Sequence, residues 1–243
     1  MATTIRFRGS GPGPQTLDGC SVEFWKLLPP GDEPSLIASA VPSRGSILEL
    51  GAGTGRITHR LLELGYSVTA IDNSAEMLAE IRGATTVLSD IEDLALSASF
   101  DAVVLGSFLI HAPALGTRAT LLEVCRRHVK RSGVVLVQHY RDGWPARAEP
   151  GFLGEKDGIK TFVDDVAHDG RFVRITLRYE AASGTWTQSF TTEALNQSEL
   201  ADALGKAGLS FDRHLGQDSS WLLARPTSGE QRRRRLRLHE TAP

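Results

Sequence analysis

A glycine-rich run, Glu49-Leu50-Gly51-Ala52-Gly53-Thr54-Gly55, stands between the apolar segment 46–50 and a helical pattern that begins near residue 55. Alternate glycines at the end of a strand let the backbone turn sharply, and they let a ligand approach more closely than a Cβ would allow. The same turn points the free N–H groups of the next helix at that ligand. The run therefore predicts a strand–loop–helix unit with a ligand site at the loop.

The spacing of these glycines distinguishes two kinds of ligand. A nicotinamide-dinucleotide loop needs its third glycine three positions after the second, and Arg56 stands three positions after Gly53. S-adenosylmethionine has no pyrophosphate, so a loop that does not place phosphates at the helix end is compatible with it. A tight turn with purely structural glycines is the alternative interpretation.

Around this loop, short apolar segments alternate with helical patterns, which is typical of a parallel sheet with crossover helices. Strands are predicted at 46–50, 67–71, 85–88, 101–105 and 134–138, and helices near 55–64, 74–82 and 117–130. A helix near 196–207, capped by Asn196 or Ser198, and two strands at 209–215 and 219–225 complete the pattern. The sequence thus predicts an α/β, Rossmann-like fold with a mostly parallel, seven-stranded sheet.

A different pattern interrupts this alternation after residue 157. Segments 172–179 and 185–190 alternate with period two around a Ser183-Gly184 turn, and 159–166 is a candidate third strand. We expect an inserted antiparallel hairpin cap, residues 157–192. Its aromatic residues supply apolar area for a bound substrate, or they simply cover the sheet or form a dimer face. They are Phe172, Tyr179, Trp186 and Phe190.

Acidic residues follow the second and third strands. Asp72, 17 residues after Gly55, is placed to accept the two hydroxyls of a ribose. Its alternative role is the N-cap of the helix that carries Met77, for which Ser74 competes. Asp90 could accept from an adenine amino group while Ile91 packs on the ring; alternatively, this segment is only a polar loop.

Histidines mark the ends of the fourth and fifth strands, where ligands of open α/β sheets bind. His111 could orient a cofactor carboxylate or act as a base, or it could cap loop carbonyls. His139, Tyr140 and Trp144 form a candidate rim for the acceptor. If the strand continues, His139 and Tyr140 point to opposite sides, so only one of them faces the pocket.

At this point the chain resembles the class I S-adenosylmethionine-dependent methyltransferases. The resemblance covers roughly residues 40–140 and is carried by the successive segments Ile47–Thr58, Val68–Arg82, Leu88–Leu94, Phe100–Pro113 and Leu121–Tyr140. The leader Gly13-Pro14-Gln15-Thr16-Leu17-Asp18-Gly19-Cys20-Ser21-Val22-Glu23-Phe24-Trp25 is similar to that of small actinobacterial-type methyltransferases, although those usually carry a tyrosine where Trp25 stands.

The resemblance implies a cofactor, S-adenosyl-L-methionine, and a set of residues for each part of the site. The cofactor-binding candidates are Glu49, Gly51, Ala52, Gly53, Gly55, Asp72, Asn73, Met77, Asp90, Ile91, Gly106 and Ser107. The catalytic candidates are His111, His139 and Tyr140, and the substrate-binding candidates are Trp25, His111, Tyr140, Trp144 and Trp186. No metal is expected, because the two cysteines, Cys20 and Cys125, lack ligand spacing.

Composition limits the partners. The net charge is −2, while residues 226–243 hold five arginines against two glutamates, so the body is acidic and a nucleic-acid partner is unlikely. No apolar run has transmembrane length, the start lacks a signal peptide's apolar core, and a cytoplasmic monomer or homodimer is expected. We predict a lid segment with a short helix near 20–28 in residues 1–45, a catalytic domain in 46–225 and a disordered basic tail in 226–243.

The predicted function is methylation of a small molecule, such as a secondary metabolite, by in-line displacement. Three alternatives remain open at this stage. A NAD-type oxidoreductase is disfavoured by the loop spacing. A nucleic-acid methyltransferase is suggested only by the arginine tail, and a catalytically inactive cofactor-binding scaffold is excluded by no feature of the sequence.

Overall fold

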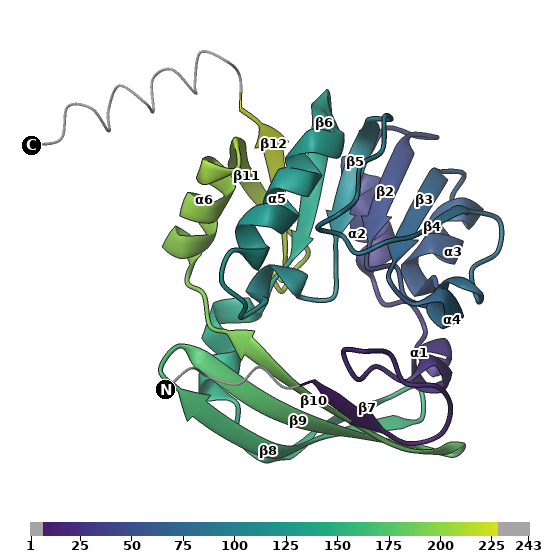
Figure 1. Ribbon diagram of the computed structural model, residues 1–243, viewed down its shortest axis with the longest axis vertical. Coiled ribbons are helices and arrows are strands. Elements are labelled where there is room, and N and C mark those ends of the chain that lie inside the picture. The colour runs from purple at the N-terminus through teal and green to yellow at the C-terminus, as the bar shows by residue number, and fades with distance from the viewer. Residues whose placement is uncertain (1–6, 228–243) are drawn as a thin grey trace, which may run out of the picture.

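The computed structural model describes residues 7–227, which form a seven-stranded sheet and a separate five-stranded antiparallel sheet (Figure 1). The larger sheet has the order β11-β12-β6-β5-β2-β3-β4. Its strands are β2 (Ser46–Leu50), β3 (Ser67–Asp72), β4 (Thr85–Leu88), β5 (Phe100–Leu105), β6 (Val129–Gln138), β11 (Leu209–Leu215) and β12 (Trp221–Pro226). Strands β6, β5, β2, β3 and β4 pair in parallel with their neighbours. Strand β12 pairs antiparallel with both β6 and β11. The predicted α/β class and the seven-stranded, mostly parallel sheet are confirmed.

Helices cover both faces of this sheet because the side chains of each strand alternate between two apolar clusters. Ile47 of β2 packs in the cluster of α2 (Glu33–Ala40) and α3 (Arg56–Glu63). Leu48 and Leu50 pack in the opposite cluster, with α5 (Thr117–His128) and α6 (Gln197–Lys206). Both faces of the central strands are therefore buried, as their continuous apolar runs require.

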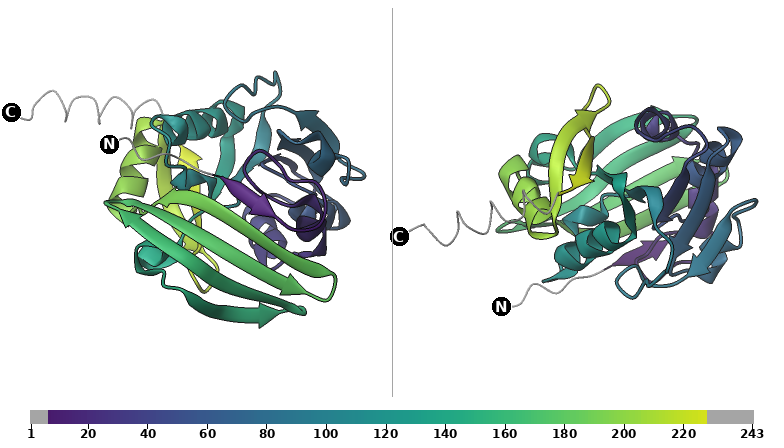
Figure 2. Two further views of the ribbon diagram at one scale, coloured as in Figure 1. Left: turned by 60° about the horizontal axis from the view of Figure 1, so that its bottom comes forward. Right: turned by 90° about the horizontal axis from the view of Figure 1, so that it is seen from above.

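The second sheet, which we call the cap, has the order β1-β10-β9-β8-β7. Its strands are β1 (Arg8–Ser10), β7 (Gly151–Lys156), β8 (Ile159–Asp169), β9 (Phe172–Ala181) and β10 (Gly184–Glu193). Figure 1 shows the cap below the larger sheet, across one end of its strands, and Figure 2 gives two further views of the same arrangement. The cap is larger than the expected hairpin because the two edge strands, β1 and β7, join it.

Four short elements remain. In the chain, α1 (Val22–Leu27) lies between β1 and α2, α4 (Ala75–Leu78) between β3 and β4, the 3-10 segment η1 (Leu109–His111) between β5 and α5, and the 3-10 segment η2 (Arg141–Arg147) between β6 and β7. Ser21 caps α1, and Asn196 forms a reciprocal capping box with Glu199 at the start of α6. Helix α4 is shorter than the predicted 74–82, and α2 was not predicted at all.

Two predictions concern the ends of the chain. Pro226, placed at the start of the tail by the sequence, is the last residue of β12, and the arginines of the tail lie outside the described residues. In the part of the chain that the structure covers, no helix is both long and apolar enough to cross a membrane.

Candidate functional site

A cavity of about 1310 Å³ lies between the carboxyl ends of the parallel strands and the inner face of the cap. Single small-molecule pockets usually measure roughly 300–1,000 Å³, so this volume has room for a cofactor and an acceptor together. All but one of the predicted cofactor residues line it: Glu49, Gly51, Ala52, Gly53, Asp72, Asn73, Met77, Asp90, Ile91, Gly106 and Ser107.

The exception is Gly55, which the loop needs for its shape. Its φ is +83°, and a Cβ there would lie 2.8 Å from Ile81 Cγ1. Gly53 is the opposite case, since its φ is +56° and an added Cβ would meet nothing within 4 Å. Gly53 borders the cavity, so this free volume is where a ligand can approach the backbone.

Asp72 connects the end of β3 to the glycine loop. Its Oδ2 accepts from the Gly53 N–H at 2.8 Å, and its Oδ1 accepts from the Ser74 N–H at 2.9 Å. The N-cap of α4 is Ser74, whose hydroxyl accepts from the Met77 N–H, so Asp72 is not the helix cap. Burial raises the pKa of Asp72, and these backbone hydrogen bonds oppose the shift. Asp72 thus shapes the loop and also presents a carboxylate to the cavity.

The ends of β3 and β4 are joined by a side-chain pair. Asn73 Nδ2 donates to Asp90 Oδ1 at 2.8 Å. Asp90 is exposed, Ile91 is half-buried beside it, and both line the cavity. The pair holds an apolar surface and a carboxylate side by side at one end of the cavity.

Glu49 is a buried carboxyl beneath the loop. Its Oε2 accepts a hydrogen bond from the Thr58 hydroxyl at 2.5 Å. Burial raises the pKa of Glu49 to about 7, while the Thr58 hydrogen bond and the charge of Arg56 act against this shift. A positive charge placed in the adjoining cavity would favour the ionised form of this carboxyl.

The turn after β5 is strained. Ser107 and Phe108 have φ values of +51° and +57°, which non-glycine residues rarely adopt. The Ser107 N–H donates to Gln138 Oε1 at 2.8 Å, so a side chain at the end of β6 holds this turn. Gln138 was not singled out in the sequence, because only the pairing of β5 with β6 brings it to Ser107.

His111 is buried, and backbone groups occupy both ring nitrogens. Nδ1 contacts the Glu193 carbonyl at 2.9 Å, and Nε2 accepts from the Tyr140 N–H at 3.1 Å. Burial lowers the pKa of His111 to about 4. A neutral ring whose Nε2 already accepts a hydrogen bond is poorly placed to take a proton, so this geometry disfavours the predicted role as a base.

Aromatic rings form the end of the cavity that lies away from the glycine loop. The Tyr140 ring stacks on Phe108 with centroids 4.4 Å apart, and its centroid lies 5.4 Å from that of Trp144. Burial raises the pKa of Tyr140 to about 12, so its hydroxyl is protonated at neutral pH. His139 and Tyr140 both line the cavity, contrary to the expectation for a continuing strand, because β6 ends at Gln138.

Of the four cap aromatics named from the sequence, Tyr179 and Phe190 line the cavity and Phe172 and Trp186 do not. Trp25 and Trp144 line the cavity, but Trp186 does not. Trp186 is 2% exposed, packs against Phe24, and donates from Nε1 to the Pro12 carbonyl at 3.0 Å. It therefore joins the leader to the cap, and its position does not support the predicted contact with the acceptor. The cap residues that line the cavity are Leu177, Tyr179, Gln188, Phe190, Thr191 and Thr192.

Comparisons with known proteins agree with this architecture. Residues 48–137 match a family model described as a methyltransferase domain. A putative methyltransferase of Bacillus subtilis is 38% identical over 77 residues, 28% of this chain and 31% of that protein. A Streptomyces fradiae enzyme, dTDP-3-amino-3,6-dideoxy-alpha-D-glucopyranose N,N-dimethyltransferase, is 29% identical over 161 residues, 62% of each chain. The chain thus spans less than two thirds of either relative.

Solved structures share the fold over most of the chain. One is S-adenosylmethionine-bound CalS10, an amino pentose methyltransferase from Micromonospora echinaspora, with a TM-score of 0.65 and 20% identity. The match covers 81% of this chain and 89% of CalS10. At this identity the similarity concerns the fold.

Proposed function

Because the chain belongs to the class I S-adenosylmethionine-dependent methyltransferases, we propose that it transfers a methyl group from S-adenosylmethionine to a small-molecule acceptor. The observation that carries this proposal is the single cavity of about 1310 Å³, which joins the glycine loop to an aromatic and polar cap surface. Two of the similar proteins, the Streptomyces fradiae N,N-dimethyltransferase and CalS10, are amino-sugar methyltransferases, which supports an acceptor of the secondary-metabolite class.

The residues at the loop end of the cavity fit the cofactor. Gly53 leaves free volume beside its backbone, Asp72 offers a carboxylate to a ribose, and Asp90 with Ile91 offers an acceptor and an apolar surface to an adenine. Glu49 provides a carboxyl that a positively charged ligand would ionise. The bound cofactor supplies an electrophilic methyl carbon, activated by a positively charged sulfur.

The residues at the cap end position the acceptor and exclude water. Phe108, Tyr140 and Trp144 provide flat apolar surfaces, and Gln188 and Thr192 add hydrogen-bonding groups. Displacement at an activated carbon depends mainly on alignment and desolvation. The Nε2 of His111 already accepts from the Tyr140 N–H, and the Tyr140 hydroxyl keeps its proton at physiological pH, so we assign both residues positioning roles instead of base catalysis.

A ligand panel measured by isothermal titration calorimetry tests the proposal. Wild-type protein is titrated with S-adenosylmethionine, S-adenosylhomocysteine and NADH. We expect micromolar or tighter binding of the first two and no measurable binding of NADH. Preferential NADH binding, or no binding of either sulfur ligand, would refute the assignment.

The acceptor end is tested separately by transfer of a tritiated methyl group. Trp144→Ala and Tyr140→Phe are compared with wild type on a panel of amino sugars and hydroxylated aromatic compounds. We expect Trp144→Ala to raise KM at least tenfold for any acceptor that is found, while affinity for S-adenosylhomocysteine stays within threefold. Equal losses in both measurements would place Trp144 outside the acceptor end.

A further inference from the structure

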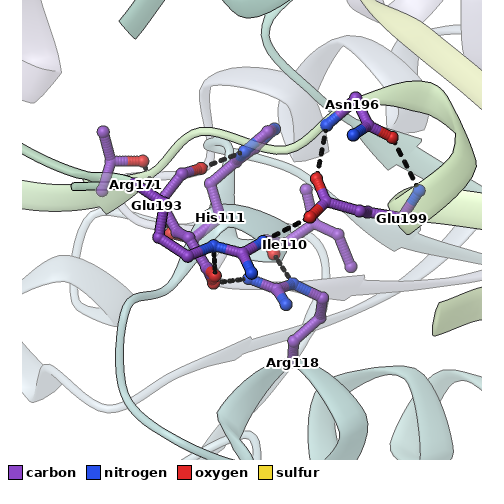
Figure 3. Close-up of polar contacts among 8 residues, drawn as sticks. Ile110, His111, Arg118, Arg171, Glu193, Asn196 and Glu199 are labelled. Atoms are coloured by element: carbon purple, nitrogen blue, oxygen red, sulfur yellow. Dashed lines mark hydrogen bonds and ion pairs between the residues drawn. The ribbon is translucent and has the colours of Figure 1, made fainter. Parts of the chain in front are cut away.

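Outside the cavity, a cluster of charged side chains joins the cap to the larger sheet (Figure 3). Its centre is Glu193, the last residue of β10, which is 8% exposed. The Glu193 carboxylate forms ion pairs with Arg118 of α5 and with Arg171 of the turn between β8 and β9. Arg171 also pairs with Glu199 of α6, with 2.8 Å between Nη2 and Oε1. One buried carboxylate thus connects elements from both sheets.

The guanidinium of Arg118 donates hydrogen bonds to two elements. Its Nη2 donates to the Glu193 carboxylate, and its Nε donates to the Ile110 carbonyl in η1 at 2.8 Å. A planar guanidinium presents donors in fixed directions, so a single side chain can hold a carboxylate and a carbonyl together. A lysine at this position would keep the charge but could not donate to both groups in the same fixed geometry.

His111, the residue after Ile110, extends the connection through the backbone. Because its Nε2 accepts from the Tyr140 N–H, its proton lies on Nδ1, which donates to the Glu193 carbonyl. The Thr192 hydroxyl adds a longer contact to the His111 carbonyl, at 3.4 Å. His111, the last residue of η1, therefore contacts both the end of β10 and Tyr140, whose ring lies at the aromatic end of the cavity.

Tyr140 is the point at which this connection reaches the cavity. Its backbone is held by His111, its hydroxyl interacts with Thr192, and its ring stacks on Phe108. Any movement of β10 away from η1 would break the contacts at Glu193 and release Tyr140 at the same time.

We propose that Arg118, Glu193 and His111 form a latch, a set of positioning residues that fixes the cap on the larger sheet and holds Tyr140 at the acceptor end of the cavity. The inference rests on the proposed function only in naming that end. The contacts themselves are independent of which ligand binds.

Hydrogen exchange measured by mass spectrometry on Arg118→Lys tests the latch. We expect at least tenfold faster exchange in segments 139–147 and 190–195, and unchanged exchange in 46–50 and 101–105. The matched control is Arg127→Lys, also in α5, whose guanidinium donates to the Leu94 carbonyl at 2.5 Å and does not touch the cap. The control should leave 139–147 and 190–195 as in wild type.

His111 supplies a second, independent measurement. In protein with ¹⁵N-labelled histidine, nuclear magnetic resonance should show the neutral Nδ1–H form at pH 5.5, with Glu193, Arg118 and His139 as the surrounding polar groups. His111→Asn, whose amide can donate and accept, should keep most of the protection of 139–147, and His111→Leu should lose it.

The outcomes separate the two proposals. Unchanged exchange in Arg118→Lys, equal acceleration in 46–50, or an Nε2–H ring in wild type would overturn the latch. S-adenosylhomocysteine should bind Arg118→Lys within threefold of wild type, because no latch residue contacts the glycine loop, and a larger loss would also count against it. Failure of wild type to bind this ligand would refute the proposed function and leave the exchange results intact.

Discussion

At the scale of single residues, Glu49 and Asp72 differ in how burial affects their chemistry. Glu49 is sealed under the loop with one hydroxyl partner, whereas Asp72 is half-buried and receives two backbone N–H groups. Burial raises the pKa of both carboxyls, and the hydrogen bonds oppose that shift, from the Thr58 hydroxyl at Glu49 and from two backbone N–H groups at Asp72. The two acids therefore differ in the partners that favour their ionised forms.

Glu49 should make the stability of the protein depend on pH. Its pKa is about 7 in the folded chain and lies near its ordinary value of 4.5 when the chain is unfolded. The folded state thus binds more protons between these values, so its stabilisation is complete below the lower pKa and is lost as pH rises through the higher one. Glu49→Gln should remove this slope, a difference on the order of 2–3 kcal/mol between pH 5 and pH 8.

Urea denaturation of both proteins at pH 5 and pH 8 measures this difference. Thr58→Val serves as a companion variant, because it removes the hydroxyl that favours the ionised carboxyl and should steepen the slope. Equal slopes in wild type and Glu49→Gln would show that Glu49 titrates normally.

Asp72 should matter for binding as well as for the shape of the loop. We expect Asp72→Ala to weaken S-adenosylhomocysteine binding at least 30-fold, about 2 kcal/mol. Asp72→Asn keeps an acceptor for the Gly53 N–H and should lose less. Isothermal titration calorimetry measures the affinity of both variants for S-adenosylhomocysteine. Unchanged affinity in Asp72→Ala would count strongly against a ribose contact.

At the scale of elements, the glycine loop offers a test that separates strain from steric block. Gly53 and Gly65 both have positive φ and open space around an added Cβ, but only Gly53 borders the cavity. Alanine at either position should cost roughly 1–2 kcal/mol of stability from the left-handed backbone. Only Gly53→Ala should also reduce S-adenosylhomocysteine affinity, by at least tenfold.

Thermal melts and calorimetry on the two alanine variants check this prediction. Similar melting temperatures with binding lost only in Gly53→Ala are expected. Equal affinities would mean that the free volume at Gly53 is not used by the ligand.

The predicted elements differ in accuracy for physical reasons. The central parallel strands β2, β5 and β6 were recognisable because both of their faces are buried, which produces uninterrupted apolar runs. The parallel edge strand β4 is largely exposed and has a weaker pattern. Strands β1 and β7 lie at the edges of the cap and are mostly exposed, so they carry no such pattern. Helix α2 buries only Pro34 and Ile37, too few apolar positions for helical spacing to stand out.

At the scale of the whole molecule, ligand binding should stabilise the folded chain by mass action. S-adenosylhomocysteine at 100 times its Kd should add about 2.7 kcal/mol to the free energy of unfolding. For a domain of this size, that corresponds to a rise in Tm of roughly 5–10 °C. Differential scanning fluorimetry should show this shift for wild type and Gly65→Ala, and a much smaller one for Gly53→Ala and with NADH.

The sequence alone determined the glycine-loop end of the cavity. Glycine spacing and the acids after β3 and β4 are local features, and each can be recognised within a window of about 25 residues. The carboxyl ends of parallel strands meet at one edge of a sheet, so these local features assemble into one surface without further information.

Only the tertiary structure decided the acceptor end. Trp186 donates to the Pro12 carbonyl in the leader, and Gln138 accepts from the Ser107 N–H in the strained turn. The ring of His111 is held by the carbonyl of Glu193, which lies 82 residues further along the chain. These contacts depend on where the cap docks on the larger sheet. Docking is set by the packing and ion pairs of many distant residues at once, which no local pattern of residue types encodes.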